Sequence, residues 1–430
     1  METLRIINTV LGAIVTVLYA YQFVFIPLQW ILWGRKKKRL KNMPKPELTG
    51  NRYAVLICAR NESNVIGDLI NSIKEQTYGQ DKLTIFVAAD NCTDDTAEKC
   101  RSMGAVVYER FDKEHVGKGY AMDLLMRSIK RDYPDAFDGF FVFDADNLLT
   151  KNYIEKMDRK AAEGFDIVTS YRNSKNYGDS WISSGYATMF MRSSRYLNHT
   201  RSLLGTSCYV SGTGYMFTKK IADEFDGWPF MMLTEDIEFS AYEILEGKLI
   251  GFCHDAEFFD EQPTKFRLSW RQRLRWSKGY LQVLRRYGVK LFKKSLRGSF
   301  ACYDLNMCIF PAYLVTIFSV LVNISISVTK VVSGQSTIPM ALLSTAGWLF
   351  GMYLPMFAVA LVTILTEWKH IHSKGYKKVL AIFTSPIFML SNVPIAFISL
   401  FSKPEWKPIE HSVSAKDIDG RSSSERLPTE

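Results

Sequence analysis

Two aspartates end an apolar run in the segment FVFDADNLLT, residues 141–150. Asp144 and Asp146 occupy alternate positions directly after Phe143. Carboxylates spaced in this way at the end of a strand can converge on one hard cation, and both Mg²⁺ and Mn²⁺ prefer carboxylate oxygen. Such a cation could neutralise the charge that develops on a diphosphate leaving group. A solvated turn would carry the same two residues, so the motif needs support from the rest of the chain.

A second pair of carboxylates lies in LTEDIEFS, residues 233–240. Glu235 and Asp236 follow a loop and open a segment with a helical pattern. Carboxylates at this position can simply cap a helix and interact with its dipole. The functional alternative makes Asp236 a general base that takes a proton from an acceptor hydroxyl, with a pKa that burial would raise towards working pH.

The third motif, RQRLRWSKGY at residues 271–280, lies in a basic amphipathic segment. Such a segment is typical of an interfacial helix whose cations face lipid headgroups. That role does not explain Gln272, Arg275 and Trp276, which share one helix face because they are three and four residues apart. A guanidinium can bind a pyrophosphate bidentately, and an indole can stack on a sugar ring.

The middle of the chain alternates strand and helix patterns, which predicts an α/β domain with a parallel, doubly wound sheet. Ligands bind such sheets beyond the carboxyl ends of the strands. The polar turns that follow the strands hold Glu62, Asp90, Asp144 and Asp146, so we expect these side chains to meet at one edge. Further along, residues 166–173 and 208–218 read as strands and residues 180–205 as helical.

Four uncharged stretches, residues 6–34, 305–329, 331–366 and 379–402, are each long enough to cross a membrane. The basic cluster at residues 35–39 places the middle domain in the cytoplasm and the N-terminus outside. The first stretch is too long for a signal peptide and lacks a cleavage site. The net charge of +10 suits anionic lipid, and no nucleic-acid motif accompanies it.

The cysteines and histidines show no metal-binding or disulfide pattern. The seven cysteines are scattered without a C-x-x-C pair, which is typical of reduced cytosolic usage, and the six histidines lack metal-ligand spacing. The stretches that could span the membrane contain no charged residue, which weighs against ion transport.

The D-A-D, T-E-D and Q-R-L-R-W motifs, in this order, resemble the inverting family 2 glycosyltransferases. More narrowly, they are similar to the processive membrane branch that includes cellulose, chitin, hyaluronan and poly-N-acetylglucosamine synthases. The resemblance covers about residues 50–280 and implies a Rossmann-like nucleotide-diphospho-sugar transferase domain of the GT-A type, flanked by transmembrane and interfacial helices.

The resemblance implies a role for each residue at the donor end. Glu62 would lie beside the nucleotide, Asp90 would contact the uracil or ribose, and Lys118 would lie near the phosphates. Asp144 would contact the nucleotide sugar and Asp146 the metal, either Mg²⁺ or Mn²⁺. The family often has two adjacent aspartates where this chain has an alanine before Asp90, so the uracil contact would rest on one carboxylate. The G-K-G around Lys118 lacks the frame of a P-loop.

The resemblance also implies the roles at the acceptor end. Asp236 would be the catalytic base, and Gln272, Arg275 and Trp276 would hold the pyrophosphate and the end of the acceptor chain. Trp228, just before the T-E-D loop, is expected to offer a platform to the acceptor. Partners would be a UDP-sugar, a polysaccharide or lipid acceptor and membrane lipid, without nucleic acid. The sequence identifies no partner subunit.

The chain is thus expected to comprise an N-terminal transmembrane helix (1–34), a cytoplasmic glycosyltransferase domain (35–260), interfacial helices (261–300), C-terminal transmembrane helices (301–402) and a polar tail (403–430). The tail is expected to be disordered after residue 410. The expected location is the plasma membrane. Related enzymes often carry a W-x-P-x-x-H-like stretch, here residues 406–411. If it docks on the cytoplasmic side, one apolar segment must be re-entrant or interfacial, and Pro386 and Pro394 single out residues 379–402.

The expected function is transfer of a sugar from a UDP-sugar to a growing β-linked polysaccharide. One alternative is a non-processive enzyme of the same family that adds one sugar to a lipid or other acceptor. Another is a membrane-anchored phosphohydrolase of the D-x-D-x-[TV] type, against which Leu148 counts because it stands where threonine or valine is required. The last is a catalytically inactive scaffold. N-acetylglucosamine and glucose are the leading candidates for the donor sugar.

Overall fold

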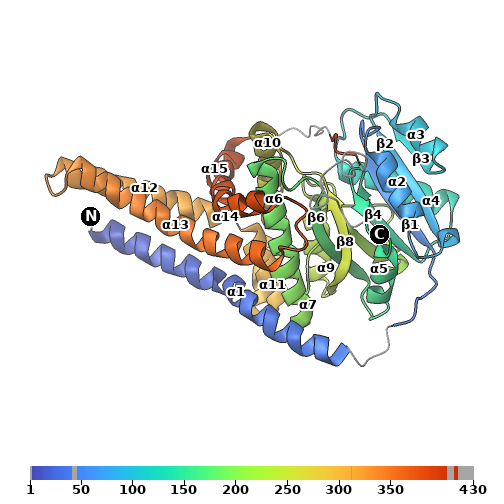
Figure 1. The fold of residues 1–430 in the computed structure, drawn as a ribbon, viewed down its shortest axis with the longest axis horizontal. Coiled ribbons are helices and arrows are strands. Elements are labelled where there is room, and N and C mark those ends of the chain that lie inside the picture. The colour runs from blue at the N-terminus through green and yellow to red at the C-terminus, as the bar shows by residue number, and fades with distance from the viewer. Residues whose placement is uncertain (1, 41–45, 311, 404–410, 415–430) are drawn as a thin grey trace.

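The structure, a computed structural model, describes residues 2–40, 46–310, 312–403 and 411–414. It has two parts (Figure 1): an α/β domain and a group of long helices that extends away from it. Residues 415–430 of the expected polar tail lie outside the described residues, as do residues 406–410 of the W-x-P-x-x-H-like stretch.

One eight-stranded sheet forms the centre of the domain, in the order β3-β2-β1-β4-β7-β6-β8-β5. The strands are β1 Tyr53–Ala59, β2 Leu83–Asp90, β3 Val106–Arg110, β4 Gly139–Asp144, β5 Leu148–Leu149, β6 Ile167–Ser174, β7 Tyr215–Thr218 and β8 Ile250–Asp260. The first four strands along the chain pair in parallel, as the alternating pattern predicts.

The second half of the sheet departs from the parallel arrangement that the strand–helix alternation predicts for the first half. Strand β7 is antiparallel to both β4 and β6, and β5 is antiparallel to β8. Only four residues of the stretch 208–218, predicted as a strand, form one, because Gly212 and Gly214 adopt φ angles of +78° and +65° and turn the chain before β7. The sequence analysis also missed β5, which is only two residues long, and β8, which lies between α9 (Glu235–Leu245) and α10 (Phe266–Leu296) and pairs in parallel with β6.

Helices cover both faces of the sheet and bury alternate residues of β1. Tyr53 and Val55 face a core with α2 (Ile66–Lys74), α3 (Thr96–Ser102) and α5 (Tyr153–Ala161). Ala54 and Leu56 face a second core with α4 (Lys118–Asp132) and α9 (Glu235–Leu245). The stretch predicted as helical at residues 180–205 forms α6 (Trp181–Arg192), a π-helical turn (Ser193–Asn198) and α7 (His199–Leu204). Short helical turns occur at Gln80–Lys82 and in α8 (Lys219–Ala222).

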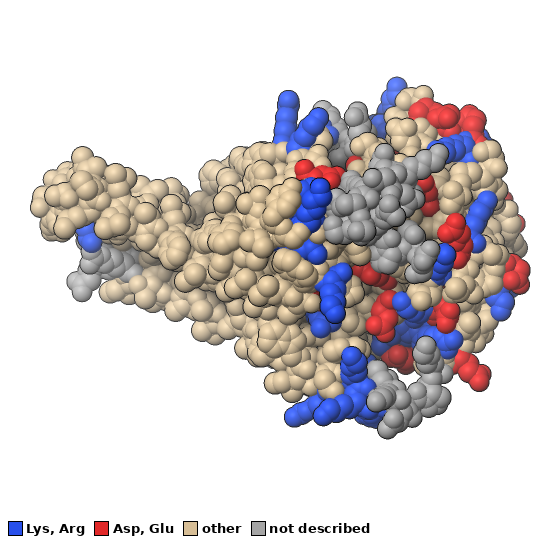
Figure 2. All heavy atoms as spheres, in the orientation of Figure 1, with Lys and Arg blue, Asp and Glu red and all other residues tan. Residues whose placement is uncertain are grey.

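Seven further helices link the domain to the extended part. They are α1 Glu2–Leu40, α10 Phe266–Leu296, α11 Phe300–Ile309, α12 Ala312–Val332, α13 Ile338–Thr366, α14 Gly375–Leu390 and α15 Asn392–Phe401. Among the described residues, four segments are long and apolar enough to cross a membrane: Ile6–Arg39, Ala312–Val332, Ile338–Thr366 and Gly375–Phe401. Helices α1, α12 and α13 form the extension, whose surface is largely uncharged, and Lys and Arg side chains gather where it meets the domain (Figures 1 and 2).

Two of these segments differ from a simple spanning helix. The uncharged stretch 305–329 is divided, because residues 305–309 belong to α11, where Leu305 packs in the core of the domain, and α12 begins at Ala312. The last segment is broken at Ser391 into α14 and α15. Of its most apolar window, 39% is buried, against 6% for the first segment. This is the segment that the two prolines single out as re-entrant or interfacial.

Candidate active site

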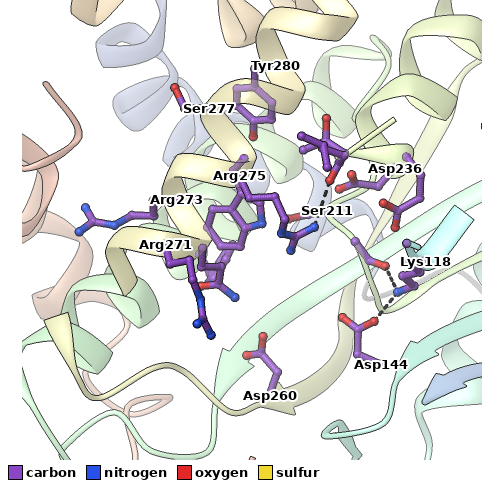
Figure 3. Close-up of a pocket in the computed structure, with 18 of the residues that line it drawn as sticks. Lys118, Asp144, Ser211, Asp236, Asp260, Arg271, Arg273, Arg275, Ser277 and Tyr280 are labelled. Atoms are coloured by element: carbon purple, nitrogen blue, oxygen red, sulfur yellow. Dashed lines mark hydrogen bonds and ion pairs between the residues drawn. The ribbon is translucent and has the colours of Figure 1, made fainter. Parts of the chain in front are cut away.

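A cavity of about 410 Å³ lies between the carboxyl edge of the sheet and α10. It brings together nine of the ten residues expected at the site: Glu62, Asp90, Lys118, Asp144, Asp146, Asp236, Gln272, Arg275 and Trp276. These residues come from strand ends, from the first turns of α4 and α9, and from the middle of α10 (Figure 3). The polar turns therefore do meet at one edge, as predicted.

Asp144 and Lys118 line the cavity next to each other. Lys118, the first residue of α4, forms an ion pair with Asp144 at the end of β4 and donates a hydrogen bond to the Gly212 carbonyl oxygen at 2.7 Å. Burial alone would lower the pKa of Lys118, but Asp144 and Glu235 raise it above its ordinary value, so the amine is charged. The next residue must be glycine, because a Cβ at Gly119 would lie 2.2 Å from the Phe230 carbonyl oxygen.

Asp146 lies beside His411, which comes from the far end of the chain. The Oδ2 atom of Asp146 is 4.0 Å from Nε2 of His411, and Nδ1 of that imidazole is 3.0 Å from Oε1 of Glu62. Burial alone would lower the pKa of His411, but Asp146, Glu62 and Glu261 raise it to about 10. The tail continues to bind the domain, since the Val413 amide donates to Glu261 at 2.8 Å. The expectation of a disordered tail is therefore wrong for residues 411–414.

The fit of a divalent cation can be judged from these side chains. A carboxylate oxygen and an imidazole nitrogen 4.0 Å apart can both reach one cation, since metal–ligand bonds are about 2.0–2.2 Å. A cation bound here would take the place of the proton that the surrounding carboxylates hold on the imidazole, because a ligating histidine nitrogen carries no proton. No cluster of three or more potential ligands occurs within the described residues. With two protein ligands, a cation here would take its remaining ligands from water and from substrate phosphates, which is the usual arrangement for Mg²⁺.

Glu235 and Asp236 open α9 on the opposite wall of the cavity. Burial raises the pKa of Asp236, and burial together with the charge on Asp236 raises the pKa of Glu235 to about 7. Lys118 and Arg275 oppose both shifts by favouring the ionised carboxylates. Within this pair, a proton is therefore held more tightly than on an exposed carboxylate, which suits a general base.

Helix α10 joins the acceptor side of the cavity to this carboxylate pair. Arg275 donates to the Leu233 carbonyl oxygen at 3.1 Å, and its side chain points from α10 towards Asp236 (Figure 3). One turn further, Gly279 lets the helix approach closely, because a Cβ there would lie 2.6 Å from Thr234. Trp276 packs edge-on against Tyr186, with ring centroids 5.8 Å apart.

The structure overturns the acceptor role expected for Trp228. This side chain is 1% exposed and does not line the cavity. Its ring packs among Phe217, Phe230 and Phe239 in the core, with centroid distances of 5.5, 5.1 and 5.0 Å. A buried indole offers no face to an acceptor, so its contribution is to packing.

Arg172, Asp260 and Tyr280 are among the lining residues that the sequence analysis did not identify. Arg172 donates to Asp260 at 2.7 Å, and this carboxylate lies at the end of β8, on the same edge as Asp146. Reading residues 250–260 as a strand would have revealed Asp260. Tyr280 lies four residues after Trp276 and lines the cavity on the same side of α10. Helical spacing alone could have found it.

A family model of known proteins matches the segment of the chain that contains these motifs. The family model described as glycosyltransferase like family 2 matches residues 51–279, more than half of the chain. The chain belongs to this family. Its domain is a mixed α/β glycosyltransferase domain, and the phosphohydrolase alternative loses its support.

Relatives in this family include transferases and a polysaccharide synthase. The probable glycosyltransferase YdaM of Bacillus subtilis (strain 168) is 22% identical over 364 residues, which cover 79% of each chain. The poly-beta-1,6-N-acetyl-D-glucosamine synthase of Staphylococcus aureus (strain MSSA476) is 24% identical over 276 residues, which cover 61% of this chain and 65% of the synthase. The chain therefore matches slightly less than two thirds of the synthase's length.

A solved structure shares the fold. The mannosyltransferase PcManGT of Pyrobaculum calidifontis, in complex with GDP-Man and Mn²⁺, superposes with a TM-score of 0.55 at 16% identity. The match covers 91% of this chain and 99% of that chain. At this identity the likeness shows the GT-A architecture, including the helices that flank the domain.

Proposed function

We propose that the protein is an inverting membrane glycosyltransferase that moves a sugar from a UDP-sugar to a growing β-linked polysaccharide. The observation that supports this best is the meeting of Asp236, Arg275 and the strand end at Asp144 and Asp146 in one cavity. A displacement at an anomeric carbon requires three groups: a base, a cation that faces the diphosphate, and a carboxylate that binds a metal.

In the proposed reaction, Asp236 takes the proton of an acceptor hydroxyl, and the oxygen forms a bond to the anomeric carbon. The bond from this carbon to the diphosphate oxygen breaks on the opposite side, so the configuration inverts. Lys118 and Arg275 stabilise the charge on the departing UDP, since their cations line the same cavity.

Asp146 and His411 are the proposed holders of Mg²⁺ or Mn²⁺, which when bound would supply positive charge to the diphosphate. The ion pair between Lys118 and Asp144 would hold that carboxylate in place for the nucleotide sugar. Glu62, which accepts from His411, would fix the orientation of the imidazole.

The acceptor is proposed to lie along α10. Gln272 and Trp276 line the cavity beside Asp236, and the cavity continues past Tyr280 to Tyr313 of α12 and Ile395 of α15. A chain that grows at Asp236 would therefore pass directly between helices of the membrane part. This path supports placing the domain in the cytoplasm, with the apolar segments crossing the plasma membrane.

A second candidate, transfer of one sugar to a lipid-linked acceptor, is favoured by the same end of the cavity. Ile309, Phe310, Ile395 and Ala396 make its membrane side largely apolar. Such a wall would suit the first part of a lipid chain as well as a sugar polymer.

The experiment that tests the proposal is a donor screen on membranes that contain the full-length protein. Labelled UDP-sugars are supplied with Mg²⁺ or Mn²⁺, and the labelled product is sized and extracted with organic solvent. We expect a long polymer from one donor, abolished by a chelator and restored by Mn²⁺. A short, extractable product would favour the lipid-linked acceptor. Neither transfer nor UDP release, in folded protein, would refute both candidates.

A further inference from the structure

The carboxylate of Asp90, which lines the cavity, accepts hydrogen bonds on one of its two oxygens. Its Oδ1 atom accepts two hydrogen bonds, from Nη1 of Arg110 at 2.8 Å and from Nδ2 of Asn91 at 2.9 Å. Within the described ranges of the chain, both hydrogen bonds to this carboxylate reach Oδ1 and none reaches Oδ2. Asp90 ends β2 and lines the cavity, whereas Arg110 does not.

The two donors are themselves fixed in place. Nη2 of Arg110 donates to Asp112 at 2.9 Å and to the His115 carbonyl oxygen at 2.6 Å. Asn91 adopts a left-handed backbone with φ of 54°, and its backbone amide donates to the Arg110 carbonyl oxygen at 2.7 Å. Its side-chain amide donates to the Asp112 carbonyl oxygen at 2.9 Å. Rotating the Asp90 carboxylate would break two hydrogen bonds to a charged group, each stronger than a neutral one.

Asp90 also lies where the base of a nucleotide would be. It ends β2, and Asp144 ends β4, with β1 between them in the sheet. Two strand spacings separate these carboxylates by roughly 10 Å. If the diphosphate lies at Asp144 and Asp146, as the proposed function requires, the nucleoside extends along the strand ends towards Asp90.

Uracil and guanine present different numbers of hydrogen-bond donors to a carboxylate. Guanine carries two adjacent donors on its pairing edge, N1–H and the N2 amino group, and these match both oxygens of one carboxylate. Uracil carries one donor, N3–H, between two carbonyl oxygens. A carboxylate with one committed oxygen can satisfy uracil, but it leaves a guanine donor unpaired, and a buried donor without an acceptor is costly.

We propose that Arg110 and Asn91 set the base specificity of the donor site by occupying Oδ1 of Asp90, so that the site takes a uridine nucleotide and rejects a guanosine nucleotide. This inference deepens the proposed function and rests on its placement of the diphosphate. It makes Arg110 and Asn91 positioning residues, since both act through Asp90.

Nucleotide binding tests the proposal without requiring sugar transfer. UDP and GDP are titrated calorimetrically, with Mn²⁺, into the purified full-length protein in detergent. We expect UDP to bind at least about tenfold more tightly than GDP, since one charged hydrogen bond changes affinity by roughly this factor or more. Arg110→Gln and Asn91→Gly, which keeps the left-handed backbone accessible, each remove one of the two donors to Oδ1. The ratio of the two affinities should fall in each variant, by about tenfold when the charged donor is lost.

Arg101→Gln is the matched control, because Arg101 pairs with Glu109 next to Arg110 and does not line the cavity. It should keep the wild-type ratio. If Arg110→Gln fails to fold, Asn91→Gly alone decides, since it removes one of the two donors. Equal binding of UDP and GDP by the wild type, or an unchanged ratio in the folded variants, would overturn the proposal.

The experiments distinguish a failure of the base specificity from a failure of the proposed function. Selective UDP binding that the variants relax, in a protein that transfers no sugar, would support the specificity inference and count against the proposed function. Sugar transfer from a GDP-sugar would overturn the specificity inference and leave a glycosyltransferase.

Discussion

Asp236 and Glu235 are adjacent carboxylates in one buried corner of the cavity, and their charges are coupled. Both lie in the first turn of α9, where the helix dipole favours their ionised forms. Burial acts against this and raises the pKa of both groups, and the charge on Asp236 raises the pKa of Glu235 further. The two groups titrate as a pair, in which Asp236 ionises first.

The pH dependence of transfer follows from this coupling. A base acts only when ionised, so the rate should fall as the pH drops through its raised pKa, at a higher pH than an exposed aspartate would give. The charge on Asp236 raises the pKa of Glu235, so Glu235 is still protonated when Asp236 ionises. Glu235→Gln keeps this neighbour neutral, so the acid limb should stay within about half a pH unit of its wild-type position. Initial transfer rates across the acid range of both proteins make the comparison. An acid limb displaced by about one unit or more would contradict this order of ionisation.

For individual residues, the sequence predicted most members of the site but not every contact between them. The residues of the three motifs converge because each motif follows a strand or opens a helix at one edge. Trp228 was misjudged because its position in the chain, near the T-E-D loop, does not reveal that its ring turns into the core. The network around Arg110 was also invisible, since it depends on the left-handed turn at Asn91.

Helix α10 is the element that links the reaction site to the membrane part. One side contacts the loop before α9 through Arg275, and another contacts the broken segment formed by α14 and α15. Nη1 of Arg273 donates to the Phe388 carbonyl oxygen at 3.1 Å and to the Ser391 hydroxyl at 2.7 Å. Lys278 donates to the Ser399 carbonyl oxygen at 3.1 Å near the end of α15. Cations of α10 therefore satisfy carbonyl groups at the ends of both helices.

Arg273→Ala should loosen the junction between α14 and α15. The side chain is 3% exposed, and its removal leaves buried carbonyl and hydroxyl groups without their charged donor. We expect a loss of about 3 kcal/mol in unfolding free energy and slower transfer. Arg285→Ala on the exposed side of α10 should change neither. Thermal unfolding of both detergent-purified variants, with transfer assays, makes the comparison. Equal stability of the two would contradict the role given to Arg273.

Sequence patterns predicted some of the helices and strands but not every break and strand direction. Apolar periodicity located the helices, and the two prolines pointed to the broken segment. The break itself falls at Ser391, since Pro394 lies in the first turn of α15, where a proline costs no hydrogen bond, while Pro386 is accommodated inside α14. The antiparallel β7 could not be read from alternation, because alternation predicts only parallel crossovers.

A buried ion pair is one of the contacts that join the two parts of the molecule. Arg201 of α7 and Asp304 of α11 have side chains 1% and 2% exposed, and Nη2 of Arg201 donates to Oδ1 of Asp304 at 3.0 Å. Tyr21 of α1 donates to the same carboxylate at 2.6 Å. The N-terminal helix, the domain and the helix before α12 therefore meet at one carboxylate, which fixes the cavity against the membrane part. No sequence pattern predicts this contact, because its partners are far apart in the chain.

The measurement that tests the account most directly compares sugar transfer and nucleotide binding in wild type and in Asp236→Asn, with Asp226→Asn, an exposed aspartate paired with Arg127, as the control. Asparagine keeps the shape of the side chain but cannot take the proton. We predict that Asp236→Asn binds UDP with Mn²⁺ about as well as the wild type and loses at least about a hundredfold in transfer rate, while Asp226→Asn behaves as wild type. An Asp236→Asn protein that transfers sugar at the wild-type rate would contradict the assignment of the base and the mechanism built on it.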